Sequence, residues 1–153
     1  MAQLAGSSDA GSGFVQKDIA GAYAFRFSGF TVAYNIVYRL AGLGQMQIDE
    51  NGTIRGEQRS AITPLGGQAA RLNRSVYRLD GNIALESDGT GSAKICFRRV
   101  TGSGVDVDGH FDVQVAGGPG RLWFLSSGST LPNASDAPAD EHVELEAIRI
   151  DTP

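Results

Sequence analysis

Residues 42–62 read Gly42-Leu-Gly-Gln-Met-Gln-Ile-Asp-Glu-Asn-Gly-Thr-Ile-Arg-Gly-Glu-Gln-Arg-Ser-Ala-Ile62, and this stretch decides the fold. On both sides of Asn51-Gly52 the residue types alternate with a period of two, which is the period of a β-strand. Asn-Gly readily supplies the two positive-φ residues of a type I′ turn, which joins antiparallel strands. The stretch therefore predicts a β-hairpin centred on Asn51-Gly52.

Most of the remaining chain repeats this logic. Tyr23, Phe25 and Phe27 alternate with small or polar residues in a first strand, and Asp80-Gly81 and Asp88-Gly89 predict two further hairpin turns. The count is eight or nine strands without a convincing helical segment. We therefore expect an all-β fold, a single antiparallel up-and-down barrel of about eight strands. Such a barrel either fills itself with side chains or holds one small ligand.

The length of the chain sets its domain organisation. A chain of 153 residues is long enough for one domain with a proper core and too short for two comfortable ones. Residues 1–13 are rich in Gly, Ser and Ala and carry no periodicity, so we interpret them as a flexible N-terminal lead-in. Residues 14–153 are then the β-barrel domain.

Charge, hydropathy and cysteine content exclude several classes of partner. The formal net charge of −4 provides no basic field for nucleic acid. No apolar run approaches the length of a membrane span. The single cysteine, Cys96, rules out an intrachain disulfide and any multi-cysteine metal site, and we expect no metal or cofactor. The localisation stays open between the cytoplasm and secretion with the leader removed.

The return strand of the central hairpin points to an internal cavity. On one of its sides it carries Gly56, Gln58 and Ser60, and glycine with two hydrogen-bonding residues fits a cavity wall better than a solid core. Pockets for small molecules combine an apolar lining with a few fixed polar groups. The candidate ligand-binding residues are Tyr23, Tyr38, Gln58, Ser60, Tyr77 and Trp123. The alternative is that these aromatic residues simply fill the core.

No constellation of residues indicates a hydrolase. The only histidines are His110 and His142, and the Gly-x-Ser-x-Gly nucleophile elbow is missing. His110 and Asp112 share one side of a predicted strand, but an exposed pair on a polar face explains them better. Catalytic residues therefore stay unassigned.

Three groups of residues carry a resemblance to a known type of protein. They are Gly21-x-Tyr23-x-Phe25, then Gly42-x-Gly44 with Asp49-x-Asn51-Gly52-x-Ile54-x-Gly56, then Tyr77 with Asp88-Gly-Thr-Gly91. Together they resemble small bacterial β-barrel proteins of lipocalin-like or allene-oxide-cyclase-like architecture, although Tyr23 stands where the lipocalin Gly-x-Trp signature has tryptophan. The resemblance implies an up-and-down barrel that binds or cyclises small, mostly apolar molecules.

Three functions follow from these observations. The first is binding of a small apolar or aromatic molecule in the barrel lumen. The second is a cofactor-free cyclase or isomerase that uses the same cavity and holds a flexible substrate in a reactive shape. The third is an oligomeric structural or interaction module, because residues 121–127 include apolar side chains on both faces of a predicted strand, as at a homo-oligomer interface.

Overall fold

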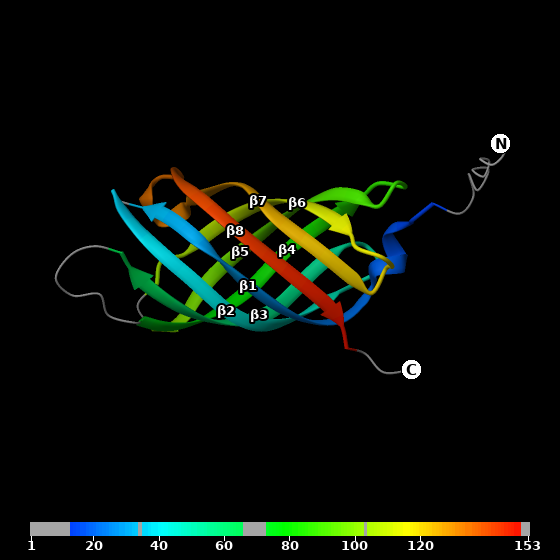
Figure 1. Cartoon of the computed structure of the whole chain (residues 1–153), viewed down its shortest axis with the longest axis horizontal. Helices are drawn as coiled ribbons and strands as arrows, with labels where there is room; N and C mark the ends of the chain where they lie inside the picture. Colours follow the sequence, from blue (N-terminus) through cyan, green and yellow to red (C-terminus); the bar gives the residue numbers. More distant parts are fainter. Residues whose placement is uncertain (1–12, 34, 66–72, 103, 151–153) are drawn as a thin grey trace.

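The computed structural model describes residues 13–33, 35–65, 73–102 and 104–150. In these ranges the chain forms eight strands that close into one antiparallel barrel, each paired with its neighbours in the sequence and the first with the last (Figure 1). The strands are β1 (Gly21–Ala33), β2 (Ile36–Ile48), β3 (Thr53–Pro64), β4 (Asn73–Leu85), β5 (Thr90–Gly102), β6 (Val107–Val115), β7 (Arg121–Leu131) and β8 (Ala137–Arg149). The predicted all-β, up-and-down barrel of about eight strands is confirmed.

Two short 3-10 helices accompany the strands in the described ranges. η2 (Gln16–Ile19) precedes β1, and η3 (Pro132–Ala134) joins β7 to β8. Neither these helices nor any other helix of the described residues is long and apolar enough to cross a membrane. Apart from Gly13, the predicted lead-in at residues 1–13 lies outside the described residues, as do residues 151–153 of the predicted barrel domain.

The hairpin predicted around Asn51-Gly52 is present, but its turn is not of type I′. Gly52 has a φ of +87°, whereas Asn51 keeps a negative φ. The Gly52 N–H donates to the Asp49 carbonyl at 3.0 Å, and the Asp49 carboxylate accepts the N–H groups of Asn51 and Thr53 at 2.8 and 2.9 Å. These bonds match a type I turn followed by a left-handed glycine. The bond from the Thr53 N–H in particular lowers the pKa of Asp49.

The two other predicted turns have different outcomes. Asp88-Gly89 is a turn, in which the Thr90 N–H donates to the Asp88 carboxylate at 2.9 Å. Asp80-Gly81 is not a turn, because β4 runs straight through it. A Cβ atom at Gly81 would lie 2.1 Å from the Lys94 carbonyl oxygen. The glycine therefore permits a close approach between β4 and β5, which is another use of glycine within a strand.

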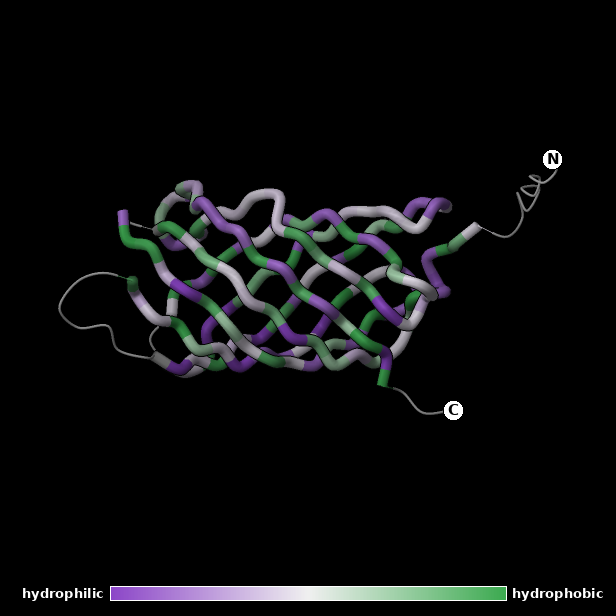
Figure 2. The backbone as a smooth tube through the Cα atoms, viewed as in Figure 1, coloured by the Kyte–Doolittle hydropathy of each residue, from purple (hydrophilic) through white to green (hydrophobic). Residues whose placement is uncertain are grey.

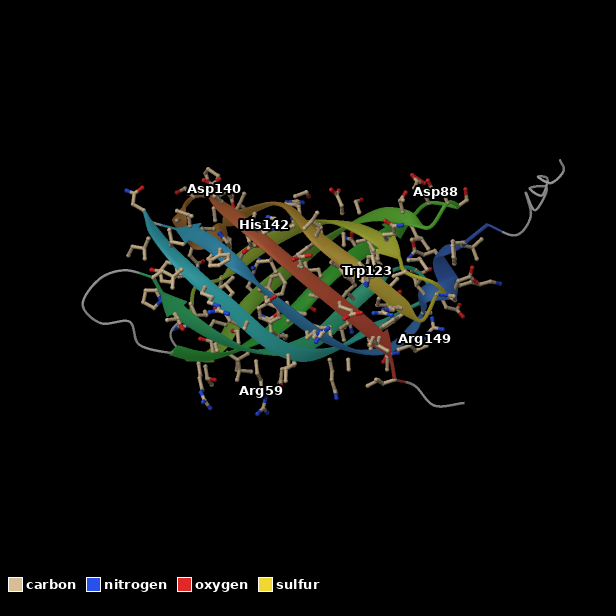
Figure 3. All side chains as sticks on the ribbon, in the orientation of Figure 1. Arg59, Asp88, Trp123, Asp140, His142 and Arg149 are labelled. Carbon is tan, nitrogen blue, oxygen red and sulfur yellow. The ribbon has the colours of Figure 1, made fainter. Side chains whose placement is uncertain are left out.

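Alternation along each strand sorts the side chains between interior and solvent. Figure 2 shows hydrophilic and hydrophobic residues succeeding each other along the strands. On β6, Phe111 and Val113 are buried whereas His110 and Asp112 are exposed. Charged side chains such as Arg59 project away from the barrel wall (Figure 3). The interior is therefore mainly apolar.

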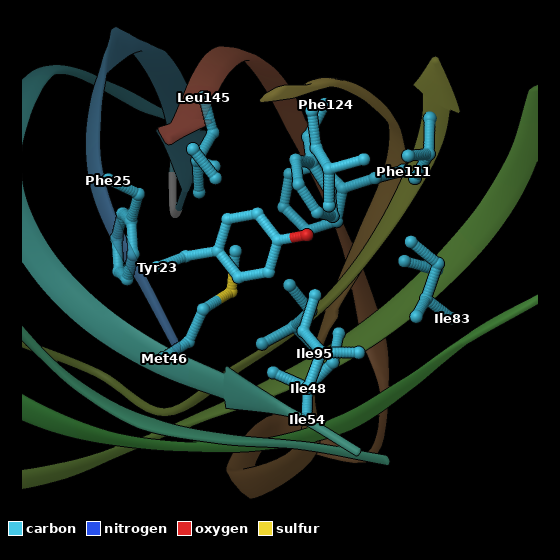
Figure 4. Close-up of a cluster of buried hydrophobic side chains, with 14 of the residues drawn as sticks. Tyr23, Phe25, Met46, Ile48, Ile54, Ile83, Ile95, Phe111, Phe124 and Leu145 are labelled. Carbon is cyan, nitrogen blue, oxygen red and sulfur yellow. The ribbon is translucent and has the colours of Figure 1, made fainter. Parts of the chain in front are cut away.

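One end of the barrel is filled by side chains and is called the plugged end here; η2 lies across it (Figure 1). Ile19 of η2 and Tyr23 of β1 are fully buried, and the Tyr23 hydroxyl donates to the Ile19 carbonyl at 2.8 Å. Arg149 donates to the Asp18 carbonyl at 2.6 Å and to the Tyr23 hydroxyl at 3.2 Å, and its guanidinium lies over the Tyr23 ring. Tyr23 stands in the middle of a packed cluster that includes Phe25, Met46, Ile48, Ile54, Ile95 and Phe124 (Figure 4).

Candidate functional site

The opposite end of the barrel contains a cavity of about 150 Å³ that is partly open to solvent. This cavity end is where β1, β3, β5 and β7 finish and where β2, β4, β6 and β8 begin. All eight strands contribute to its wall, together with the segment around Gly104 and Val105. Most of the lining is apolar, with Phe27, Leu40, Phe97, Phe111, Val143 and Leu145 among its residues.

Strand β3 shows how the interior changes from one end to the other. Its inward positions begin with Ile54, which is fully buried at the plugged end. They continue with Gln58, Ser60 and Ile62, all of which line the cavity. The side chains of Gln58 and Ser60 carry hydrogen-bonding groups where a filled barrel would carry aliphatic ones. The cavity wall predicted from this strand is therefore present from residue 58 onward.

The space beside the two glycines of β2 next to this wall is filled by aromatic rings. Gly42 and Gly44 pair with Ser60 and Gln58 of β3. A Cβ atom at Gly42 would lie 2.4 Å from the Phe27 ring, and one at Gly44 would lie 2.3 Å from the Phe25 ring. The two rings of β1 thus lie over the glycines, which make room for them. The cavity begins beyond these rings, where the side chains are shorter or more polar.

Two buried polar side chains lie in the cavity wall, and one of them has no partner among the described residues. Gln58 and Ser60 are buried, and the Ser60 Oγ atom has no hydrogen-bond partner in the described part of the chain. Buried polar groups are normally hydrogen-bonded, so an unpaired hydroxyl in a cavity wall is a ready contact for a ligand. Tyr77 adds a buried phenol; burial, helped by the negative charge of Asp106, raises its pKa and keeps the hydroxyl neutral.

Glu141 is the cavity residue that sequence reasoning missed. Strand β8 begins at Ala137, not at His142 as the sequence suggested, and Glu141 shares the inward parity of Ala139 and Val143. Its side chain lines the cavity, and burial raises the pKa of this carboxyl to about 7 even with the Ser129 hydroxyl beside it. The sequence could have indicated this position, because the alternation that turns Val143 and Leu145 inward, continued back by two residues, also turns residue 141 inward.

A β-bulge in β7 holds the backbone next to Glu141. Against β6, Gly128 pairs with His110 and Ser126 with Phe111, so Ser127 is an extra residue in β7. Against β8, the pairing is interrupted where residues 126–128 face residues 140–143. Ser126 bridges the interruption: its Oγ atom donates to the Glu141 carbonyl at 3.0 Å and accepts the Val143 N–H at 2.9 Å. Bulges beside sites commonly redirect side chains. Here the inward positions of β7 change from Leu122 and Phe124 to Ser129 and Leu131.

Four of the six predicted site residues meet in the cavity wall. They are Tyr38, Gln58, Ser60 and Tyr77. Tyr23 lies in the plugged end, where its hydroxyl is already bonded. Trp123 lies on the outer face of β7 with 52% of its surface exposed, and the Arg121 guanidinium stands 5.9 Å from its ring centre (Figure 3).

The other groups considered for chemistry lie on the outer surface. His110, Asp112 and His142 are exposed, and His142 is labelled on β8 in Figure 3. Cys96 also lies outside the cavity, and the pKa of its thiol is raised by burial and by neighbouring Asp108, which disfavours the thiolate. Within the described ranges, no group of three or more His, Cys, Asp or Glu side chains is placed to hold a metal ion.

Comparison of the chain with protein-family models, with curated proteins and with solved structures found no match. The class of protein is therefore defined by the fold and the cavity alone, without assignment to a family. The chain is an eight-stranded, antiparallel up-and-down β-barrel, consistent with a lipocalin-like fold, and it has a mainly apolar cavity at one end.

Proposed function

We propose that the protein binds a small, mostly apolar or aromatic molecule at the cavity end of the barrel. The observation that carries this proposal is the unfilled, mainly apolar space of about 150 Å³ within a barrel whose other end is filled. An engineered apolar cavity of about 150 Å³ in another protein binds benzene. A ligand built around one ring or a short branched chain therefore matches the space.

The polar groups in the wall give such a ligand an orientation. Gln58 contributes an amide, Ser60 an unpaired hydroxyl and Tyr77 a neutral phenol, each on a strand and not on a loop. A few polar groups in an apolar pocket fix how a ligand lies and select among ligands of similar size. A ligand with one polar end thus fits better than a pure hydrocarbon.

Binding of 2-phenylethanol, measured by isothermal titration calorimetry and ligand-observed NMR, tests this proposal. Ser60→Leu fills the cavity wall and is expected to weaken binding at least tenfold. Arg59→Leu is the matched control, because Arg59 neighbours Ser60 but projects outward (Figure 3); this variant should bind as the wild type does. Equal binding by Ser60→Leu, or failure of the wild-type protein to bind 2-phenylethanol and other compounds with the same phenylethyl group, contradicts a ligand site in the lumen.

A second candidate function is a cofactor-free cyclase or isomerase, the activity implied by the resemblance to allene-oxide-cyclase-like barrels. The observation that favours it is Glu141, a cavity carboxyl with a pKa of about 7 and therefore suited to proton transfer at neutral pH. The test is deuterium exchange into a small aryl ketone in D2O. Exchange catalysed by the wild type and by the outward-facing control Glu144→Gln, but lost in Glu141→Gln, supports catalysis. Equal rates in all three proteins contradict it.

A third candidate, assembly into a homo-oligomer, is favoured by apolar side chains on the outer faces of β7 and β8. Trp123, Leu125 and Ile148 are each about half exposed there. Light scattering tests this function: a dimer that dissociates in Trp123→Lys supports an interface at this surface. A monomer at all concentrations contradicts it.

A further inference from the structure

The part of the cavity lining that the structure describes includes one acidic side chain and no basic one. The described residues that line it include no Arg, Lys or His side chain, and Glu141, Tyr38 and Tyr77 are its only titratable members. Among the described residues, the Ser129 hydroxyl is the one group besides burial that affects the pKa of the Glu141 carboxyl. Near Tyr77, outside the cavity lining, Asp106 adds a negative charge and Arg99 a positive one. A carboxylate in an apolar wall without a cation is costly for the protein to keep ionised.

We propose that the ligand is a small lipophilic amine whose ammonium group pairs with Glu141 while its apolar body points toward the plugged end. This inference rests on the proposed function, since it names the class of molecule that the cavity binds. A ligand cation supplies the counter-charge that the described lining residues do not provide, and a carboxylate–ammonium bond is stronger than a neutral hydrogen bond.

The order of residues along β8 gives the orientation. Glu141 lies near the beginning of the strand at the cavity end, and Val143 and Leu145 follow it into the barrel and line the same cavity. Phe27 and Phe111 of other strands extend this apolar lining. A molecule with a charged nitrogen at one end and a ring or alkyl group at the other matches this order, with a carboxyl group first and apolar side chains deeper in the barrel.

The remaining wall groups suit an ammonium group and disfavour a carboxylate. An ammonium group donates three hydrogen bonds and accepts none. The Gln58 carbonyl, the Ser60 hydroxyl and the Tyr77 hydroxyl are all capable acceptors in the same wall. The aromatic faces of Tyr38, Tyr77 and Phe97 offer cation–π contacts. An anionic ligand, by contrast, meets the repulsion of Glu141.

Binding of an amine is expected to depend on pH in a defined direction. The groups to consider around Glu141 are the Ser129 hydroxyl, which does not titrate, and Tyr77, whose pKa is raised by burial and which has the charges of Asp106 and Arg99 near it. Glu141 with a pKa of about 7 must ionise to pair with the ammonium group. Affinity should therefore fall by roughly tenfold as the pH falls from 8 to 6.

Three probes that share a phenylethyl group test the inference on the full chain: 2-phenylethylamine, 2-phenylethanol and 3-phenylpropionate, titrated by calorimetry at pH 8 and pH 6. We expect the amine to bind at least tenfold tighter than the alcohol at pH 8, and the propionate to bind weakest. Glu141→Gln should lose this preference while still binding the alcohol, which shows that it is folded. The matched control Glu144→Gln, altered on the outer face of the same strand, should keep it.

The possible failures are distinguishable. If the wild type binds the alcohol as tightly as the amine, or if Glu141→Gln keeps the preference for the amine, the inference is overturned while the proposed lumen site stands. If the propionate binds tightest, the charge assignment is wrong. If none of the three probes binds, the proposed function fails and this inference fails with it.

Discussion

The two ends of the barrel are built from the same eight strands but hold different contents. At the plugged end, Ile54 on β3 is fully buried among aliphatic and aromatic side chains. At the cavity end, Ile62 on the same strand is only partly buried and lines open space. An eight-stranded barrel is just wide enough for side chains to fill it. Strand number alone therefore does not decide whether such a barrel holds a cavity.

The difference between the two ends comes from the side chains that point into the barrel there. At the plugged end, η2 inserts Ile19, and Tyr23 and Arg149 tie that helix to the barrel through hydrogen bonds. At the cavity end, the inward positions include Ser60 and Glu141, which are too short or too polar to pack a core. The plugged end thus supplies stability, and the cavity end gives up part of that stability by leaving space unfilled.

Truncating one isoleucine at each end is the strongest test of this comparison. Ile54→Ala removes fully buried methyl groups and leaves a void, so we expect a loss of about 2–5 kcal/mol in the free energy of unfolding. Ile62→Ala is the matched change on the same strand. It should cost less than about 1 kcal/mol, because one side of Ile62 already faces empty space. Urea unfolding at one pH measures both values; equal losses would show that the cavity end is packed as well.

The fold was predictable because its signal is local and repeated. Period-two alternation and the Asn51-Gly52 and Asp88-Gly89 turns were enough to predict an antiparallel barrel of about eight strands. The conformations of two Asx-Gly segments could not be predicted, because they depend on contacts that the local sequence does not reveal. Asp80-Gly81 has the composition of a turn, but its glycine serves the approach of the Lys94 backbone. The Asn51-Gly52 turn takes its geometry from bonds to the Asp49 carboxylate.

The lining of the cavity was predictable where a strand has one clear inward face. On β3 the parity that contains Gln58 and Ser60 faces the interior, and both residues line the cavity. On β7 both faces are apolar, so parity could not place Trp123, and the bulge at residues 126–128 then reverses which positions face inward. Glu141 was missed because the strand was predicted to begin one residue too late to include it.

The next largest effect concerns the pH dependence of stability at the cavity end. Glu141 has a pKa of about 7 in the folded protein, well above the value near 4.5 of an ordinary glutamate. The folded state thus binds a proton more tightly than the unfolded chain. Stability from this group is present below pH 4.5 and is lost as the pH rises to about 7. At roughly 1.4 kcal/mol per pKa unit, the full effect is up to about 3 kcal/mol.

Glu141→Gln should remove this loss. We expect the variant to be more stable than the wild type by up to about 3 kcal/mol at pH 8.5 and to match it at pH 4. Chemical unfolding across this pH range measures the difference, with Glu144→Gln on the outer face as the control that should show no such trend. A variant that is less stable at pH 8.5 would mean that the carboxylate is paired inside the folded protein, contrary to its placement in an apolar wall.

The smallest effect compares one tyrosine hydroxyl at each end. Tyr23→Phe removes a buried donor to the Ile19 carbonyl and an acceptor for Arg149, so we expect a loss of about 1–3 kcal/mol and faster amide exchange in η2. Tyr77→Phe removes a hydroxyl that borders the cavity, and its cost should stay below about 1 kcal/mol while ligand affinity changes. If Tyr77→Phe were the more damaging of the two, the cavity end would depend on internal hydrogen bonds as much as the plugged end does, and its polar groups would be structural and not free to meet a ligand.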